Sequence, residues 1–190
     1  MISSILLVLI GAIATGAFQL GFSVRERSRE AETILTAIAS EVDAVCRLVR
    51  HQQYFEFASQ IAGAIRDDTW DGTTLIVDIR ENYFSVYEGL ASKLGMLQPI
   101  QAVKIVNFYA YCKSLIDSTR PDGPNAVSDG NIYASGNMLS VEALLISILH
   151  LGDEIIALPS TSLHLAAAQA ELPAIKIVPG EVPYPPQASR

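Results

Sequence analysis

The sequence predicts an all-α protein, in which an N-terminal transmembrane helix continues into a long helix that packs in an antiparallel helical bundle. The first segment, residues 2–22, contains no charged residue. After it, apolar residues recur at steps of three and four, which is the spacing of one helix face. We therefore divide the chain into a transmembrane anchor at residues 2–22, a bundle domain at 23–172 and a proline-rich tail at 173–190, which we expect to be disordered.

The length of the uncharged segment matches a bilayer. Residues 2–22, at a rise of about 1.5 Å each, cover roughly 32 Å, close to the ~30 Å thickness of the hydrocarbon core. The alternative is a cleaved signal peptide, because Ala12-Ile13-Ala14 resembles a cleavage site. No basic residue precedes Ile2 and the run is long, so we favour the anchor.

The orientation of the anchor follows from three arginines. Arg25, Arg27 and Arg29 lie just after it, whereas only the α-amine precedes it. The positive-inside rule then places the C-terminal domain in the cytoplasm.

The anchor also carries small residues at helical spacing, namely Ala12, Gly16, Ala17 and Gly21. Such pairs let two transmembrane helices approach closely, although glycine and alanine are common in any spanning helix. The expected partners are the lipid bilayer and either a second copy or another membrane protein.

A long helix is expected from residue 23 to residue 66. One apolar stripe comprises Ile34, Ile38, Val42, Val45 and Val49, and a second comprises Tyr54, Ala58, Ile61 and Ile65. Five residues separate the two stripes, so the pattern slips near residues 51–53. Such a slip rotates the buried face or marks a bend.

Turn chemistry follows at residues 67–74, where aspartate, glycine and threonine gather. Trp70 is expected to pack this loop onto the bundle. Residues 75–79 are apolar, and we expect extended loop or a first helical turn there, since a lone strand has no partner.

The next two helices are expected to form a hairpin. The first covers residues 80–94 and ends with Gly95 as its C-cap, and the second covers residues 98–117 with Pro99 in its first turn. Its apolar residues are Val103, Val106, Phe108, Tyr109, Cys112, Leu115 and Ile116. The short connection at residues 95–98 requires antiparallel neighbours.

A long loop is expected at residues 118–138, where proline, glycine, aspartate and asparagine are frequent. Ser140 then caps a helix that extends to about Leu158, and residues 160–172 can form a further helical piece.

The stretch Glu81–Leu115 combines a tyrosine-rich helix, a KLGMLxP motif at residues 93–99 and an AxxIVxFY motif at residues 102–109. It resembles a group of uncharacterised bacterial proteins that have one N-terminal membrane helix and a helical domain. The resemblance covers about a fifth of the chain and implies architecture and a bacterial origin, but no activity. Together with the anchor, it leads us to expect a protein of the bacterial inner membrane. Gln98 and Gln101 depart from the pattern, which has apolar or acidic residues there.

The composition gives no support to nucleic-acid binding or to catalysis. A net charge of −7 and a pI near 4.9 oppose binding to nucleic acid. We find no phosphate loop, no Gly-x-Gly-x-x-Gly motif and no Gly-x-Ser-x-Gly elbow. The sequence therefore predicts a protein that is not an enzyme, with no catalytic residues and no cofactor.

Histidines and cysteines give only weak indications of a site. His51, His150 and His164 lack the spacing of metal ligands, and His150 is expected to form a surface ion pair with Asp153 or Glu154. Cys46 and Cys112 are interpreted as small core residues rather than as a disulfide.

Aromatic residues are the remaining candidates for a site. Tyr83, Tyr87, Phe108 and Tyr109, together with Phe84 and Tyr111, either pack the core or line a ligand pocket. We favour core packing, and expect a membrane-tethered helical interaction or scaffold module. The alternative is a membrane-anchored sensory domain that binds a small ligand between helices near Tyr87 and Tyr109.

Overall fold

The computed structural model describes residues 2–73, 75, 77, 81–120 and 134–158, and within the first helix it describes side chains from Phe22 onward. Its helices are α1 (Ile2–His51), α2 (Tyr54–Arg66), η1 (Glu81–Phe84), α3 (Ser85–Leu90), η2 (Ala91–Met96), α4 (Pro99–Thr119) and α5 (Ala134–Ile156). No strand occurs in these residues. The prediction of an all-α protein is confirmed for them.

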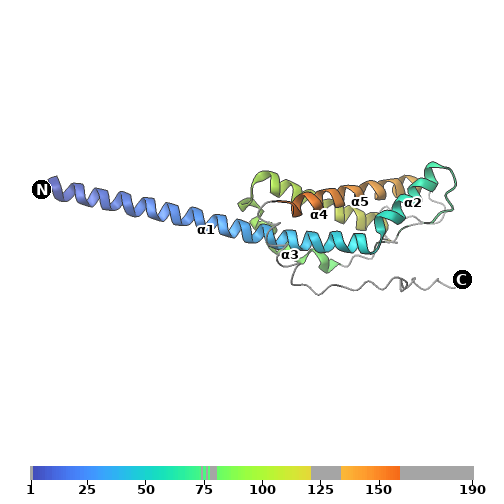
Figure 1. Cartoon of the computed structure of the whole chain (residues 1–190), viewed down its shortest axis with the longest axis horizontal. Helices are drawn as coiled ribbons and strands as arrows, with labels where there is room; N and C mark the ends of the chain where they lie inside the picture. Colours follow the sequence, from blue (N-terminus) through green and yellow to red (C-terminus); the bar gives the residue numbers. More distant parts are fainter. Residues whose placement is uncertain (1, 74, 76, 78–80, 121–133, 159–190) are drawn as a thin grey trace.

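Helix α5 lies at the centre of the bundle. It packs against α1, α2 and α4, while α1 also contacts η1, α3 and η2 (Figure 1). Helices α1 and α4 run in the same direction and α5 runs opposite to both. The predicted helical bundle is therefore confirmed.

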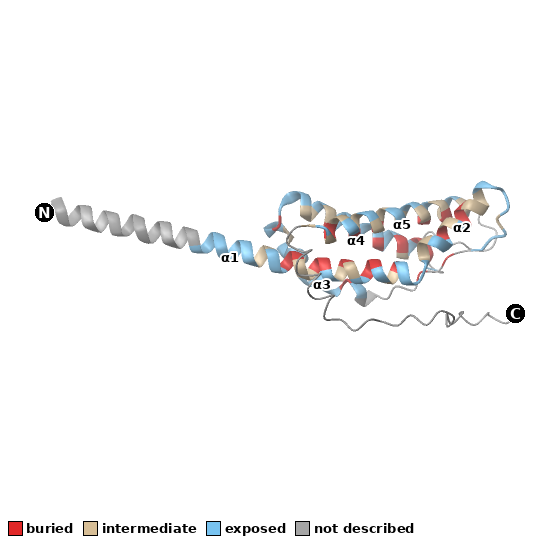
Figure 2. Cartoon of the chain, in the orientation of Figure 1, coloured by how far each residue is buried: buried red, intermediate tan, exposed pale blue. Residues whose placement is uncertain are grey.

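The core is made of the inward faces of these helices (Figure 2). Its largest fully buried side chains are Tyr109, Phe108, Ile38, Ile105, Leu115, Leu145, Ile148 and Ile155. The predicted stripe from Ile34 to Val49 is buried along its whole length. Apolar burial at about 25 cal/mol per Å² is the main term that holds such helices together.

Helix α1 is one unbroken helix of 50 residues, and its N-terminal part projects away from the bundle (Figure 1). Among residues with described side chains, no helix has the length and apolar character needed to cross a bilayer. The predicted anchor, residues 2–22, lies outside that description except for Phe22. The small residues Ala12, Gly16, Ala17 and Gly21 lie outside it too.

The slip in the apolar pattern corresponds to a bend. The expected helix 23–66 is divided, because α1 ends at His51 and α2 begins at Tyr54. Gln53 takes the left-handed conformation, with φ 55° and ψ 31°. Because the left-handed conformation is unfavourable for residues other than glycine, the turn is stabilised by the packing of α1 and α2 on α5 and not by the backbone preference of Gln53.

The segment after α2 packs as an irregular chain. Trp70 is partly buried against the core, as the sequence predicted. Its Nε1–H also donates to the carbonyl of Thr73 at 2.8 Å. Leu75 and Val77 are buried, although they lie in neither a helix nor a strand.

The expected single helix at residues 80–94 is wrong in detail. The chain forms a 3-10 turn, a short α-helix and a second 3-10 turn instead. Gly95 lies inside η2 and has no positive φ, so it is not a left-handed C-cap. Gly89 and the bend at Leu90, with φ −107° and ψ 0°, explain why a regular helix does not persist.

The start of α4 agrees with the sequence. Pro99 is its first residue, where its missing N–H costs nothing. The backbone N–H of Gln98 donates to Gln101 Oε1 at 3.1 Å, which gives Gln101 a helix-capping role.

Helix α5 begins at Ala134, six residues before the predicted cap Ser140. Ser140 Oγ donates to the carbonyl of Gly136 at 2.9 Å, as an interior serine does, so its assignment as N-cap is wrong. The predicted loop 118–138 is shorter at both ends. Residues 121–133, the helical piece at 160–172 and the tail at 173–190 lie outside the described residues.

Candidate interaction surface

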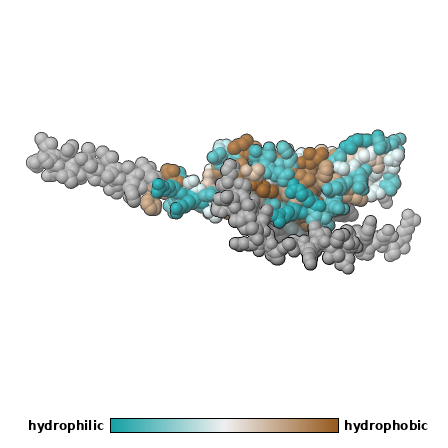
Figure 3. All heavy atoms as spheres, viewed as in Figure 1, coloured by the Kyte–Doolittle hydropathy of each residue, from teal (hydrophilic) through white to brown (hydrophobic). Residues whose placement is uncertain are grey.

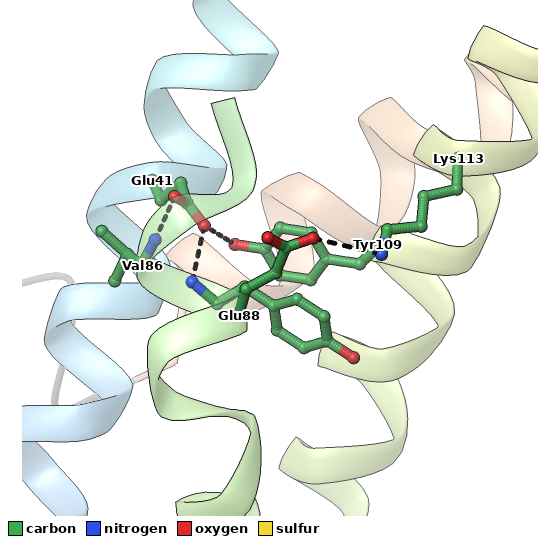
Figure 4. Close-up of polar contacts among 6 residues, drawn as sticks. Glu41, Val86, Glu88, Tyr109 and Lys113 are labelled. Atoms are coloured by element: carbon green, nitrogen blue, oxygen red, sulfur yellow. Dashed lines mark hydrogen bonds and ion pairs between the residues drawn. The ribbon is translucent and has the colours of Figure 1, made fainter. Parts of the chain in front are cut away.

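A single carboxylate links three elements of the bundle. Glu41 on α1 accepts hydrogen bonds from the N–H of Val86 at 2.8 Å, from the N–H of Tyr87 at 3.0 Å and from the hydroxyl of Tyr109 at 2.6 Å (Figure 4). Helix α3 has no side-chain cap of its own. Glu41 therefore supplies from a distant helix the acceptor that an N-cap residue normally provides.

The predicted aromatic group is only partly assembled. Tyr87 stacks on Tyr109 with ring centroids 3.9 Å apart, and Phe84 and Phe108 meet Tyr109 edge-on at 5.5 and 5.2 Å. Tyr83, by contrast, is 43% exposed and lies outside this group. The group packs the core as expected, since its rings are already in contact.

The chemistry of this group is that of a structural contact. Burial, together with the hydrogen bond to Glu41, raises the pKa of the Tyr109 hydroxyl. The phenol therefore stays neutral and donates its hydrogen bond throughout the physiological pH range.

The two cysteines are buried and unpaired, on α1 and α4. Burial raises the pKa of the Cys46 thiol to about 12 and also raises that of Cys112. Because the thiolate is the reactive form, neither residue is a nucleophile near neutral pH. Their interpretation as core residues is confirmed.

The acidic residues near His150 contact basic side chains at the surface. His150 Nε2 lies 3.6 Å from Glu154 Oε1, while Asp153 instead pairs with Arg50 at 2.6 Å. No group of three histidine, cysteine or acidic side chains suited to a metal occurs in the described part of the chain.

An open pocket lies elsewhere than predicted, in the corner between α1 and the start of α4. Its volume is about 460 Å³, and its lining residues are Arg27, Ser28, Ala31, Glu32, Leu35, Met96, Leu97, Gln98 and Gln101. The predicted site between Tyr87 and Tyr109 has no such space between its rings, which stack at contact distance.

The feature that the sequence reasoning missed is the outer face of α4. Its inner stripe, which includes Ile105, Phe108 and Cys112, packs on the rest of the bundle. Val103 and Val106, grouped above with the apolar residues of this helix, are 54% and 43% exposed. Ile100 on the same face is 60% exposed. Figure 3 shows apolar patches of this kind among the polar residues of the bundle surface.

This outer face carries no charge over three turns. Its residues are Ile100, Val103, Val106, Asn107, Ala110, Tyr111 and Ser114, all exposed. The signal in the sequence was a second apolar stripe, on nearly the opposite side of the helix from the first. Comparisons with protein-family models, with curated proteins and with solved structures find no match to this chain.

Proposed function

We propose that this chain is a membrane-tethered helical interaction module that holds the uncharged face of α4 out to a protein partner. The observation that carries the proposal is the exposure of Ile100, Val103 and Val106 side by side on a well-packed helix. Large contiguous apolar patches are rare on monomeric soluble domains and usually mark binding sites.

The tether is proposed from the sequence. Residues 2–22 are uncharged and long enough to span a bilayer, and α1 continues from them into the core without a break. The arginines that follow favour a cytoplasmic bundle at a bacterial inner membrane. The small residues from Ala12 to Gly21 would provide a second contact between anchors.

The rest of the bundle supports a role in binding rather than in catalysis. The buried thiols and the Tyr109 hydroxyl are held in their neutral forms, and the ion pairs tie elements together at the surface. These groups stabilise a rigid platform, and a rigid helix face loses little entropy when it binds.

A sensory domain is the second candidate, and the open pocket between α1 and α4 favours it. Arg27, Glu32 and Gln98 offer polar contacts there, while Leu35 and Leu97 offer apolar ones. A small molecule that co-purifies with the wild type, and is lost when Leu97→Trp fills the pocket, would support this role. Mass spectrometry of the denatured protein measures it.

The main proposal is tested in cell membranes with the full chain. A photo-crosslinking amino acid is placed at Val103 on the α4 face, and at Ala143, an exposed residue of α5, as the matched control. We expect a protein adduct from position 103 only, in a fraction that stays with the membranes after an alkaline wash. Release of the chain by the wash would contradict the tether, and equal labelling at both positions would contradict the binding face.

A further inference from the structure

We propose that the partner of α4 is a second copy of this chain, paired helix to helix in parallel so that residues of equal number face each other. The inference rests on the proposed function, because the shared membrane sets the parallel orientation. It adds the identity of the partner and the register of the contact.

The spacing of the exposed face is that of a coiled-coil seam. Ile100, Val103, Asn107, Ala110 and Ser114 follow one another at steps of 3, 4, 3 and 4, and all five are exposed. This is the 3.5-residue repeat of the a and d positions, with Ile100, Asn107 and Ser114 at a. Helix α4 thus carries two stripes: one packs against α5 and the other has this repeat.

The flanks of the seam agree with a parallel pair. In that arrangement the residue before an a position meets the partner residue five positions further on. Here those residues are Val106 and Tyr111, which are 43% and 37% exposed and both apolar. A parallel pair would bury the two together, whereas the isolated chain leaves both in water.

Both lysines at the edge of the seam are paired within one chain, and the seam ends before Asp117, which is exposed at the next d position. Lys104 Nζ lies 3.3 Å from Glu154 Oε2, and Lys113 Nζ lies 3.4 Å from Glu88 Oε1. Equivalent lysines of two copies would otherwise repel each other across the seam. With these partners, like charges oppose the contact only weakly.

Asn107 selects the form of the contact. A single asparagine at an a position favours two parallel strands in one register, because its amide pairs with the same residue of the partner. Ala110 and Ser114 beyond it are small, so the two backbones can come close. The seam is therefore modest in energy, and the shared membrane supplies effective concentration.

The orientation follows from the packing of α4 against α1. The first turn of α4 and the residues before it line the same pocket as Arg27 and Ala31, and Lys93 pairs with Glu30 at 2.9 Å. Helix α4 thus starts at the end of the bundle nearest the anchor and runs away from it, alongside α1 (Figure 1). Two copies anchored in one membrane would present α4 in the same direction.

Cysteine crosslinking of the full chain in membranes tests the register. We expect Val103→Cys and Ala110→Cys, each at a d position, to form disulfide-linked dimers on mild oxidation. Ala143→Cys and the wild type, whose two thiols are buried, should not. An antiparallel pair would place a positions opposite d positions and would instead link, for example, Ile100→Cys to Ala110→Cys in mixed membranes, and that result would overturn the parallel register.

A charge variant provides the second readout. Val103→Glu places like charges at the seam and should lower crosslinking at Ala110→Cys at least about tenfold, a change of ~1.4 kcal/mol. Asn107→Leu should raise it. Crosslinking at positions 103 and 110 no greater than at 143 would overturn this inference. In that case, a photo-adduct to a different protein at position 103 in the same membranes would still support the proposed interaction module. The absence of any adduct at position 103 would contradict both the interaction module and the dimer.

Discussion

Removal of Glu41 affects three contacts at once, because its carboxylate accepts hydrogen bonds from Val86, Tyr87 and Tyr109. Without it the buried Tyr109 hydroxyl loses its acceptor, and leaving a buried donor unpaired costs about 1–3 kcal/mol. We expect Glu41→Ala to lower the free energy of unfolding by at least that amount, as measured by urea denaturation.

Glu88→Gln is the matched control for Glu41. It removes only a surface ion pair with Lys113, which should change stability by less than ~0.5 kcal/mol. Tyr109→Phe should lose less stability than Glu41→Ala, because the backbone N–H groups of Val86 and Tyr87 keep Glu41 as their acceptor. Equal losses for Glu41→Ala and Glu88→Gln would show that Glu41 does not link the three elements.

Cys46 gives the fold a dependence on alkaline pH. Its folded-state pKa is about 12, against an ordinary value of 9.0, because burial disfavours the thiolate. Its contribution to stability is therefore complete below pH 9 and is lost as pH rises toward 12. The free energy of unfolding should fall by up to ~1.4 kcal/mol per pH unit from this thiol alone.

The measurement is urea denaturation at about pH 8 and about pH 10.5. Cys46→Ala should lose less stability between the two values than the wild type does. Val45→Ala makes a comparable void in the core beside it without removing a titrating group, so it should keep the slope of the wild type. If the free energy of unfolding of Cys46→Ala fell with pH as steeply as that of the wild type, the pH dependence would not come from the Cys46 thiol.

At the scale of elements, α1 and α5 meet at Gly152. A Cβ at this position would overlap Cys46 Sγ and come within 3.3 Å of Phe108 Cε2. We expect Gly152→Ala to destabilise the protein by about 1–3 kcal/mol, since the helices must separate to admit the methyl group. Thermal and urea denaturation measure the loss.

Two further variants define the Gly152 contact. Gly63→Ala is the control, because Gly63 lies in α2 with open space around it and alanine there should stabilise by ~0.5–1 kcal/mol. Adding Cys46→Ala to Gly152→Ala should restore part of the loss, as the overlapping sulfur is gone. Additive effects would mean that the two helices do not meet there as described.

The elements themselves could be predicted where one periodic face is buried. The stripe from Ile34 to Val49 and the start of α4 at Pro99 are both read directly from spacing and proline chemistry. The series η1–α3–η2 could not be predicted in this way, because the start of α3 depends on a capping group from Glu41, which lies 45 residues before Val86 in the chain. The early start of α5 was hidden by Ser135, Gly136 and Asn137, whose turn preference is overridden once Met138 is buried.

The site was harder to predict than the fold for a physical reason. Helix α4 is apolar on two sides, so its sequence alone does not say which stripe meets α5 and which meets solvent. Tyr87 and Tyr109 were correctly assigned to packing, but the hydrogen bond to Glu41 needs knowledge of three elements together. The pocket between α1 and α4 has no local motif at all.

At the scale of the whole molecule, the proposed topology predicts which surfaces face the cell interior. A membrane-impermeant maleimide should label Ser3→Cys in intact spheroplasts, and Ser92→Cys, on the exposed part of η2, only after the membrane is opened. The wild type, with both thiols buried, is the background control. Labelling of Ser92→Cys before permeabilisation would place the bundle on the outer side.

Because α1 is unbroken, the direction in which the bundle faces depends on the number of residues in the helix before it. Each residue added to a helix turns everything beyond it by about 100° and advances it by ~1.5 Å. One alanine inserted after Ser23 would therefore rotate the bundle by more than a quarter turn relative to the proposed tether, and the α4 surfaces of the proposed pair would point apart. Seven inserted alanines, nearly two full turns, would bring those surfaces back into alignment at a greater height above the bilayer.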